Sequence, residues 1–202
     1  MKNQILFSFF FVAGLLIIAC QPNQKVTVDA DADAVQTDTV PQMTHADSVK
    51  QGDYLVSLMG CHECHSPKIM TDQGPVPDPD RLLSGHPANE ALPKITDKSM
   101  LGPGQWYLAS SGLTAWVGPW GTSFTANLTP HPTGTGNWTI DNFSRALRQG
   151  KFKGLENGRT LLPPMPWQFF AKMTDEDMSY IWAYIRSLKP VDNTVPATIA
   201  PM

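Results

Sequence analysis

The chain has 202 residues, of which 42% are hydrophobic and 16% charged, and its formal net charge is −3. This length and composition suffice to bury one hydrophobic core, which predicts a single domain. The acidic balance disfavours a nucleic-acid-binding protein, because such proteins need a basic surface to meet phosphate. The odd number of cysteines, namely Cys20, Cys61 and Cys64, argues against a disulfide framework.

The N-terminal residues have the pattern of an export signal. Lys2 precedes an apolar run over residues 5–18, shorter than the ~20 apolar residues that cross a bilayer comfortably. The run ends in IIAC at residues 17–20, which resembles a bacterial lipobox, so we expect a signal peptide over 1–19 and a lipid on Cys20. An ordinary secretory signal or a short membrane anchor is the alternative. Either way the chain is expected to be exported, as a membrane-anchored lipoprotein of the bacterial envelope that faces the periplasm.

Residues 20–44 are predicted to form a flexible acidic tether. The segment shows neither helical nor alternating periodicity, and it cannot bury enough apolar surface to offset its ordering entropy. Its aspartates lack the loop glycine and terminal glutamate of a calcium-binding EF-hand. A folded domain is then expected over residues 45–192, followed by a C-terminal tail over 193–202.

An apolar stripe predicts a helix that ends just before residue 61. The stripe consists of Tyr54, Leu55, Leu58 and Met59. Asp47 or Ser48 is available as the N-terminal cap. Gly52 is unfavourable inside a helix, which indicates a close contact at that position, with the last helix as the expected partner.

Residues 61–65 read CHECH, a CxxCH motif. Two thiols at this spacing can add to the two vinyl groups of one haem, and His65 then lies beneath the iron. A structural zinc site would need further ligands, a thioredoxin-like redox pair would need a βαβ context, and a disulfide would leave His65 unexplained. The motif therefore predicts one covalent haem c on Cys61 and Cys64, with His65 as an axial ligand.

Residues 66–137 are rich in Gly, Pro and Trp and carry no clear period. We expect this stretch to wrap the haem and exclude water, with buried packing for each of Trp106, Trp116 and Trp120. His86 and His131 are expected on the loop surface, although either could replace an iron ligand.

A second helix is predicted over Ile140–Gln149, with Thr139 before it, Gly150 after it, and Ile140, Phe143 and Leu147 inward. Basic residues crowd the segment from residue 145 to residue 159, which holds Glu156 as its one acid. They are Arg145, Arg148, Lys151, Lys153 and Arg159. We expect Arg148, Lys151 and Lys153 to contribute to docking of an acidic redox partner. The alternative is a solvated helix end, with Arg159 paired to a haem propionate.

Met165 is the expected sixth ligand of the iron. Prolines at residues 163, 164 and 166 restrict the backbone around it, so the loop could hold a thioether over the open haem face. A thioether opposite an imidazole favours reduced iron and suits electron transfer. The alternative for any methionine is core filling.

The last helix is expected to begin after Thr174 and to stop at Pro190. Its buried face is predicted to consist of Met178, Ile181, Trp182, Ile185 and Leu188. Three such helices with long irregular connections predict an all-α fold class.

These motifs together resemble a class I cytochrome c domain: CxxCH, then MPW at 165–167, then the last helix. The segments at 124–130 and 134–138 are similar to the cytochrome c subunits of bacterial membrane-bound dehydrogenases. The resemblance covers about residues 46–191. It implies the cytochrome c fold, with about three core helices around one haem and long Gly/Pro/Trp-rich loops. It also implies thioether attachment through Cys61 and Cys64 and axial ligation by His65 and Met165. Such subunits often carry several haem domains, whereas this sequence has one CxxCH and no internal repeat.

The sequence thus predicts a monohaem electron carrier rather than an enzyme. It would link a dehydrogenase or respiratory complex to another carrier in the cell envelope. Its partners would be redox proteins and the lipid membrane, with no nucleic acid and no small-molecule substrate. The alternative from a different class is a haem enzyme, such as a peroxidase, or a small-gas sensor with a labile sixth ligand. A further option is an assembly subunit whose haem is structural.

Overall fold

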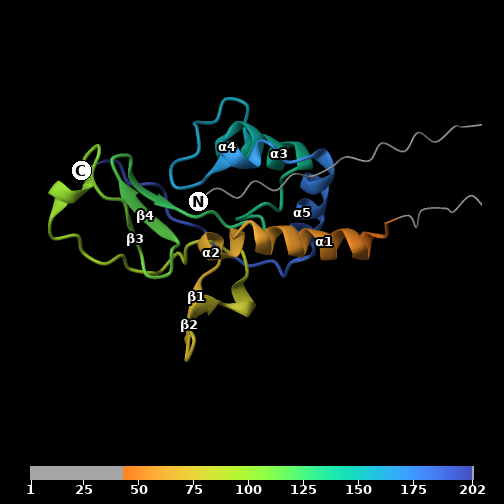
Figure 1. Ribbon diagram of the computed structural model, residues 1–202, viewed down its shortest axis with the longest axis horizontal. Helices are drawn as coiled ribbons and strands as arrows, with labels where there is room; N and C mark the ends of the chain where they lie inside the picture. The colour runs from red at the N-terminus through yellow and green to blue at the C-terminus, as the bar shows by residue number, and fades with distance from the viewer. Residues whose placement is uncertain (1–42, 202) are drawn as a thin grey trace, which may run out of the picture. The chain divides into compact units, whose positions relative to one another are not determined.

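The structure is a computed structural model that describes residues 43–201 (Figure 1). The expected signal peptide, the lipidated Cys20 and nearly all of the tether lie outside these residues and stay predictions. Within the described part, no helix is both long enough and apolar enough to span a bilayer.

The first and last helices of the described chain, α1 (His45–Leu58) and α5 (Asp175–Ser187), pack against each other (Figure 1). Gly52 makes the close approach possible, because a Cβ atom at this position would overlap the carbonyl oxygen of Tyr180. The predicted contact between Gly52 and the last helix is therefore confirmed.

Each of the three long helices begins with a threonine whose hydroxyl accepts a hydrogen bond from the amide three residues on. The pairs are Thr44–Asp47 for α1, Thr139–Asn142 for α3 (Ile140–Gln149) and Thr174–Asp177 for α5. The caps of α3 and α5 were predicted from the sequence. The cap of α1 was expected at Asp47 or Ser48, which is wrong, because the Asp47 carboxylate instead accepts from the Thr44 amide.

The buried faces of α1, α3 and α5, together with Leu83 from the segment after β2 (Gly74–Pro77), form one hydrophobic core. Its members are Val56, Leu83, Phe143, Leu147, Met178, Ile181, Tyr184 and Ile185. The sequence placed Phe143, Leu147 and most of the α5 face correctly. The predicted inward position of Ile140 is wrong, since this residue is 38% exposed. The predicted stripe on α1 is wrong in part, since Tyr54 and Leu58 are 58% and 69% exposed and Val56 takes the buried position. Val56 lies four residues after Gly52, so both face α5.

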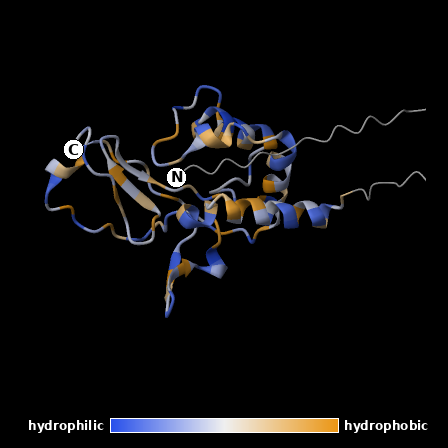
Figure 2. Ribbon diagram, viewed as in Figure 1, coloured by the Kyte–Doolittle hydropathy of each residue, from blue (hydrophilic) through white to orange (hydrophobic). Residues whose placement is uncertain are grey.

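The predicted all-α fold class is wrong. Besides five α-helices, residues 43–201 contain two small antiparallel sheets, one of two strands and one of three (Figures 1 and 2). The strands are β1 (Lys68–Thr71), β2 (Gly74–Pro77), β3 (Leu108–Ala109), β4 (Ala115–Gly118) and β5 (Gly121–Phe124). Single 3₁₀ turns occur at Pro79–Arg81, Lys98–Leu101 and Phe152–Gly154.

The sheets arise from residues that the sequence analysis treated as irregular loop. Two residues, Pro119 and Trp120, connect β4 to β5, and Gly121 follows with φ of 93°, a conformation that L-residues rarely adopt. The strands themselves are too short to show an alternating pattern. Two expectations for this stretch also fail: Trp106 is 68% exposed, and His86 is fully buried rather than on the loop surface.

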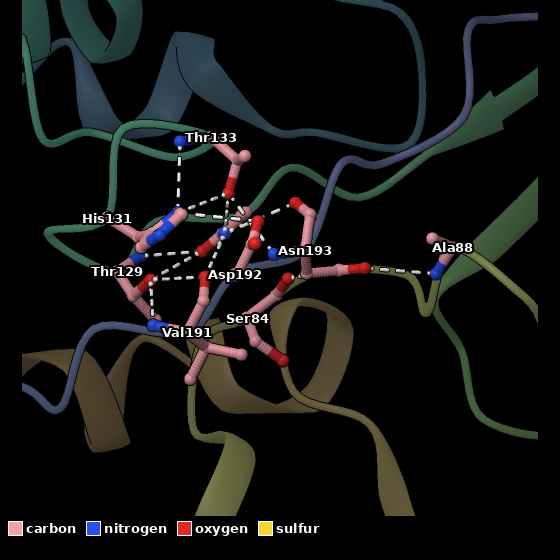
Figure 3. Close-up of polar contacts among 9 residues, drawn as sticks. Ser84, Ala88, Thr129, His131, Thr133, Val191, Asp192 and Asn193 are labelled. Carbon is pink, nitrogen blue, oxygen red and sulfur yellow. Dashed lines mark hydrogen bonds and ion pairs between the residues drawn. The ribbon is translucent and has the colours of Figure 1, made fainter.

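The C-terminal segment lies against this loop region rather than apart from it. Thr122 of β5 and Ile199 exchange backbone hydrogen bonds in both directions. The Asn193 side chain accepts from the amide of Ala88 at 3.0 Å (Figure 3). It also donates to the carbonyl oxygens of Ser84 and His86 at 2.7 and 2.9 Å. These bonds fix residues 84–86, which adjoin the CxxCH motif in space.

Candidate haem-binding site

The CxxCH motif forms its own short helix, α2 (Cys61–His65), directly after α1 (Figure 1). Gly60 separates the two helices in a left-handed conformation, which ends α1 and turns the chain. Cys61 and Cys64 are both free thiols. Because they are three residues apart on a helix, their side chains lie on one face. The helix therefore presents both sulfur atoms to a single group.

Burial disfavours the thiolate form of both cysteines. It raises the pKa of Cys61 to about 11, and it also raises the pKa of Cys64. A thioredoxin-like redox pair instead needs a thiol whose pKa is lowered. The raised pKa values thus argue against a thioredoxin-like redox pair.

The imidazole of His65 is held in one orientation. Its Nδ1 lies 2.8 Å from the carbonyl oxygen of Ala126. A carbonyl only accepts, so Nδ1 carries the proton and Nε2 keeps its lone pair for a metal. Burial lowers the pKa of His65, which favours this neutral form.

Residues 85 and 125–127 pack directly against the motif. The amide of Gly85 donates to the carbonyl oxygen of His65 at 2.7 Å. Gly85 has φ of 78°, and a Cβ atom there would lie 2.6 Å from the amide nitrogen of Asn127. Sequence reasoning missed both Gly85 and Ala126, because each acts through its backbone and the contacts span at least twenty residues.

Lys68 closes the C-terminal end of α2. Its ammonium group donates to three carbonyl oxygens, those of His62 at 3.1 Å, Glu63 at 2.7 Å and Ser66 at 2.9 Å. A cation at this end satisfies carbonyls that lack partners within the helix and opposes the helix dipole. Burial lowers the pKa of Lys68. The sequence signal was a basic residue three positions after the motif, which the sequence analysis did not use.

The second residue of the motif ties α2 to α5. One ring nitrogen of His62 lies 3.3 Å from the hydroxyl of Tyr184, and the other lies 3.1 Å from the hydroxyl of Ser66. The Ser66 hydroxyl in turn accepts from the amide of Leu83 at 2.9 Å. Burial lowers the pKa of His62, and mainly burial raises that of Tyr184.

Met165 lies in the loop between α3 and the short helix α4 (Trp167–Phe170). Its half-buried side chain packs against the same hydrophobic core that Cys61 contacts. The structure thus brings the predicted sixth ligand and the attachment helix to one core. Trp138 and Leu128 pack against that core as well, and they add apolar surface around it.

The basic segment divides into two groups. Arg148 is engaged within the fold, since it pairs with Asp175 at 2.6 Å and donates to the carbonyl oxygen of Met173. Arg145 donates to the carbonyl oxygen of Gly154 and pairs with Glu156, and the guanidinium of Arg159 stacks 4.0 Å from the Phe152 ring. No ion pair within residues 43–201 engages the two lysines, Lys151 and Lys153.

The residues at the motif fit a covalently bound haem by their chemistry. Cys61 and Cys64 place two thiols on one helix face, and the imidazole of His65 is fixed through Nδ1. Met165 places a thioether against the hydrophobic core that Cys61 also contacts. Within residues 43–201, no group of three or more His, Cys, Asp or Glu side chains converges as a metal site. A groove of about 740 Å³ lies elsewhere, between residues 92–103 and one face of the β3–β4–β5 sheet.

No family model matches the chain, but its sequence is similar to several curated proteins. It is 31% identical over 170 residues to the fructose dehydrogenase cytochrome subunit of Gluconobacter japonicus, a match that covers 83% of this chain. It is 40% identical over 145 residues to the cytochrome c subunit of alcohol dehydrogenase (quinone) from Gluconobacter oxydans, which covers 71%. The chain is a relative of dehydrogenase cytochrome c subunits.

A third match supports the same relationship. The gluconate 2-dehydrogenase cytochrome c subunit of Pantoea cypripedii is 32% identical over 137 residues, 67% of this chain. These matches cover 27%, 22% and 22% of the three relatives, so the chain spans about a quarter of their length. The resemblance drawn from the sequence motifs is therefore confirmed.

Proposed function

We propose that this chain is a monohaem c-type cytochrome that transfers single electrons in the bacterial cell envelope. The observation that carries the proposal is the fixed CxxCH helix, in which the Ala126 carbonyl holds His65 with its Nε2 free. The names of the relatives, all cytochrome subunits of dehydrogenases, support it. When bound, haem supplies an iron that changes oxidation state by one electron.

In this proposal Cys61 and Cys64 hold the haem covalently, while His65 Nε2 and the Met165 sulfur bind the iron. The half-buried position of Met165 supports ligation, because Met165 packs against the same core as Cys61. A thioether ligand would favour reduced iron. The surrounding apolar side chains exclude water from the site. The chain itself is an electron carrier rather than an enzyme.

The test of attachment is a comparison of wild type with the variant Cys61→Ala/Cys64→Ala, both exported in a host that matures cytochromes c. Wild type should give haem staining after denaturing electrophoresis, and the double variant should give none and be largely unfolded. Met165→Ala should lose the iron–thioether charge-transfer band, lower the potential and open the iron to cyanide. A variant at Met165 with an unchanged spectrum would reject this ligand alone, without touching the attachment.

We propose that a dehydrogenase or respiratory complex supplies the electrons and that the partner docks near Lys151 and Lys153. Within residues 43–201 these two lysines have no ion pair, whereas Arg148 is held by Asp175 and is less available. The amide of Leu161 donates to the Gly150 carbonyl oxygen at 2.7 Å, so the lysines lie at the base of the Met165 loop. Cations at that position would attract an acidic partner toward the haem.

The docking test replaces both lysines by glutamate and follows electron transfer against ionic strength. Lys50→Glu/Lys98→Glu is the matched control, because both of its lysines are exposed and lie outside the segment, and it changes the net charge equally. We expect the first variant to lose rate at low salt with spectrum and potential intact, and the control to keep it. Equal effects of the two variants would show that net charge alone matters.

We further propose that Cys20 carries the membrane anchor of the mature protein. The motif IIAC at residues 17–20 supports this assignment. Wild type should incorporate labelled fatty acid and fractionate with membranes, and Cys20→Ser should do neither. Membrane association without label would indicate a plain N-terminal anchor instead.

A further inference from the structure

The loop that carries Met165 is poor in hydrogen-bond donors. Three of its residues are prolines, Pro163, Pro164 and Pro166, and none of them has a backbone N–H group. Such a loop can be fixed to the rest of the fold by hydrogen bonds chiefly through its carbonyl oxygens. Donors must therefore come from another element.

One side chain supplies that donor. The hydroxyl of Ser123, on β5, donates to the carbonyl oxygen of Pro163 at 2.7 Å across forty residues of sequence. Within residues 43–201, the other hydrogen bond that joins residues 162–166 to an element comes from the adjoining α4, whose Phe169 amide donates to the Pro166 carbonyl oxygen at 3.0 Å. The bond from Ser123 is the one that ties this segment to an element distant in sequence. Ser123 is only 8% exposed, so water competes weakly for the bond.

A second contact orients the Ser123 hydroxyl. The indole nitrogen of Trp120 donates to the Ser123 oxygen at 3.2 Å. That donor occupies one lone pair of the oxygen and leaves the hydroxyl proton free to donate. Two carbonyl oxygens lie within reach of this proton, that of Pro163 at 2.7 Å and that of Trp116 at 3.5 Å, and the shorter distance favours Pro163. Trp120 is itself held in place by the edge of the Tyr107 ring, at 4.8 Å between ring centroids.

We infer that Ser123 is a positioning residue for Met165: it holds the loop on the three-stranded sheet so that the thioether stays at the iron. The inference rests on the proposed function. The iron–thioether bond competes with external ligands whenever the loop moves away, so a tie two residues from the sulfur limits how often the site opens. Trp120 acts through Ser123 in the same way.

The test measures cyanide binding to the oxidised full-length protein. Ser123→Ala should bind cyanide about fivefold to tenfold faster than wild type, the factor that loss of one buried hydrogen bond gives. Ser123→Thr keeps the hydroxyl and should restore the wild-type rate. Ser110→Ala is the matched control, because Ser110 directly follows β3, is similarly buried at 7% and has its side-chain hydrogen bond to Ala115 rather than to the loop. The cyanide-binding rate of Ser110→Ala should stay within about twofold of wild type, because the Ser110 hydroxyl oxygen accepts from the Ala115 amide and does not hold the Met165 loop.

Several outcomes would overturn the inference. A cyanide rate in Ser123→Ala equal to that of Ser110→Ala would reject it, even if both variants lose thermal stability. If Ser123→Ala fails to mature, Trp120→Phe decides, because it leaves the hydroxyl but removes its donor; an unchanged rate there rejects the inference. An unchanged spectrum in Met165→Ala would instead reject ligation by Met165, so the two failures are distinguishable.

Discussion

The two sides of the candidate site are held by different forces. On the side of His65, the Ala126 carbonyl accepts a hydrogen bond from the imidazole, and the Gly85 amide and the Lys68 ammonium donate to carbonyl oxygens of the motif helix. On the side of Met165, the loop relies on apolar packing, on the stiffness of its prolines and on one hydrogen bond from Ser123. We therefore expect the backbone around His65 to be rigid and the Met165 loop to move more easily. In the proposed function, this arrangement would keep the haem attached while the sixth ligand stays replaceable.

The largest effect should come from breaking the histidine side at Gly85. A Cβ atom there meets the 126–127 backbone at 2.6 Å in a left-handed conformation. Gly85→Ala should therefore lower the free energy of unfolding by about 2–4 kcal/mol in urea titrations of the haem-loaded protein. Gly102→Ala is the control, because its Cβ would meet only the flexible Gln105 side chain at 3.7 Å. Equal losses in the two variants would contradict a rigid frame around His65.

A medium loss of stability is expected on replacing Lys68. This change should affect the His65 side of the site and leave the Met165 side unchanged. Lys68→Met leaves three carbonyl oxygens without their cationic donor, which should lower the free energy of unfolding by about 1–3 kcal/mol. Lys68→Arg should recover part of this loss, and the exposed Lys50→Met should be neutral. The cyanide-binding rate should stay near wild type in Lys68→Met, the reverse of the pattern expected for Ser123→Ala. A faster cyanide rate would mean that the two sides are coupled.

The smallest effect should appear in acid. Asp78 adjoins the histidine side, since its amide donates to the Pro67 carbonyl oxygen at 2.8 Å. Hydrogen bonds from Arg81 and then from the Asp80 amide lower the pKa of its carboxyl. The pKa of the Asp78 carboxyl is therefore lower in the folded protein than in the unfolded chain. The resulting stabilisation is present above the ordinary pKa of about 4, and it is lost as the pH falls through the pKa of the folded protein. The free energy of unfolding should decline less steeply in Asp78→Asn than in wild type as pH falls below that range. Parallel declines would show that Asp78 contributes nothing.

The sequence by itself determined the elements whose signals are local. Thr139 and Gly150 bracket α3 as predicted, and Thr174 begins α5, because caps act within one helical turn. Gly52 indicated the packing of α1 on α5, since an unfavourable residue inside a helix needs a reason. The CxxCH motif and Met165 were identified by residue type and spacing, and the relationship to cytochrome c subunits followed from them.

Only the tertiary structure decided what depends on backbone atoms and distant partners. The Ala126 carbonyl that orients His65 comes from sixty-one residues away, and any residue type supplies a carbonyl. Ser123 reaches Pro163 only because two short strands, without a readable period, fold back as a hairpin. The exposed face of α1 and the burial of His86 likewise depend on which surfaces the other elements cover. The residue types show which chemical groups are present. The orientation of these groups depends on contacts between distant segments, which form only when the chain folds.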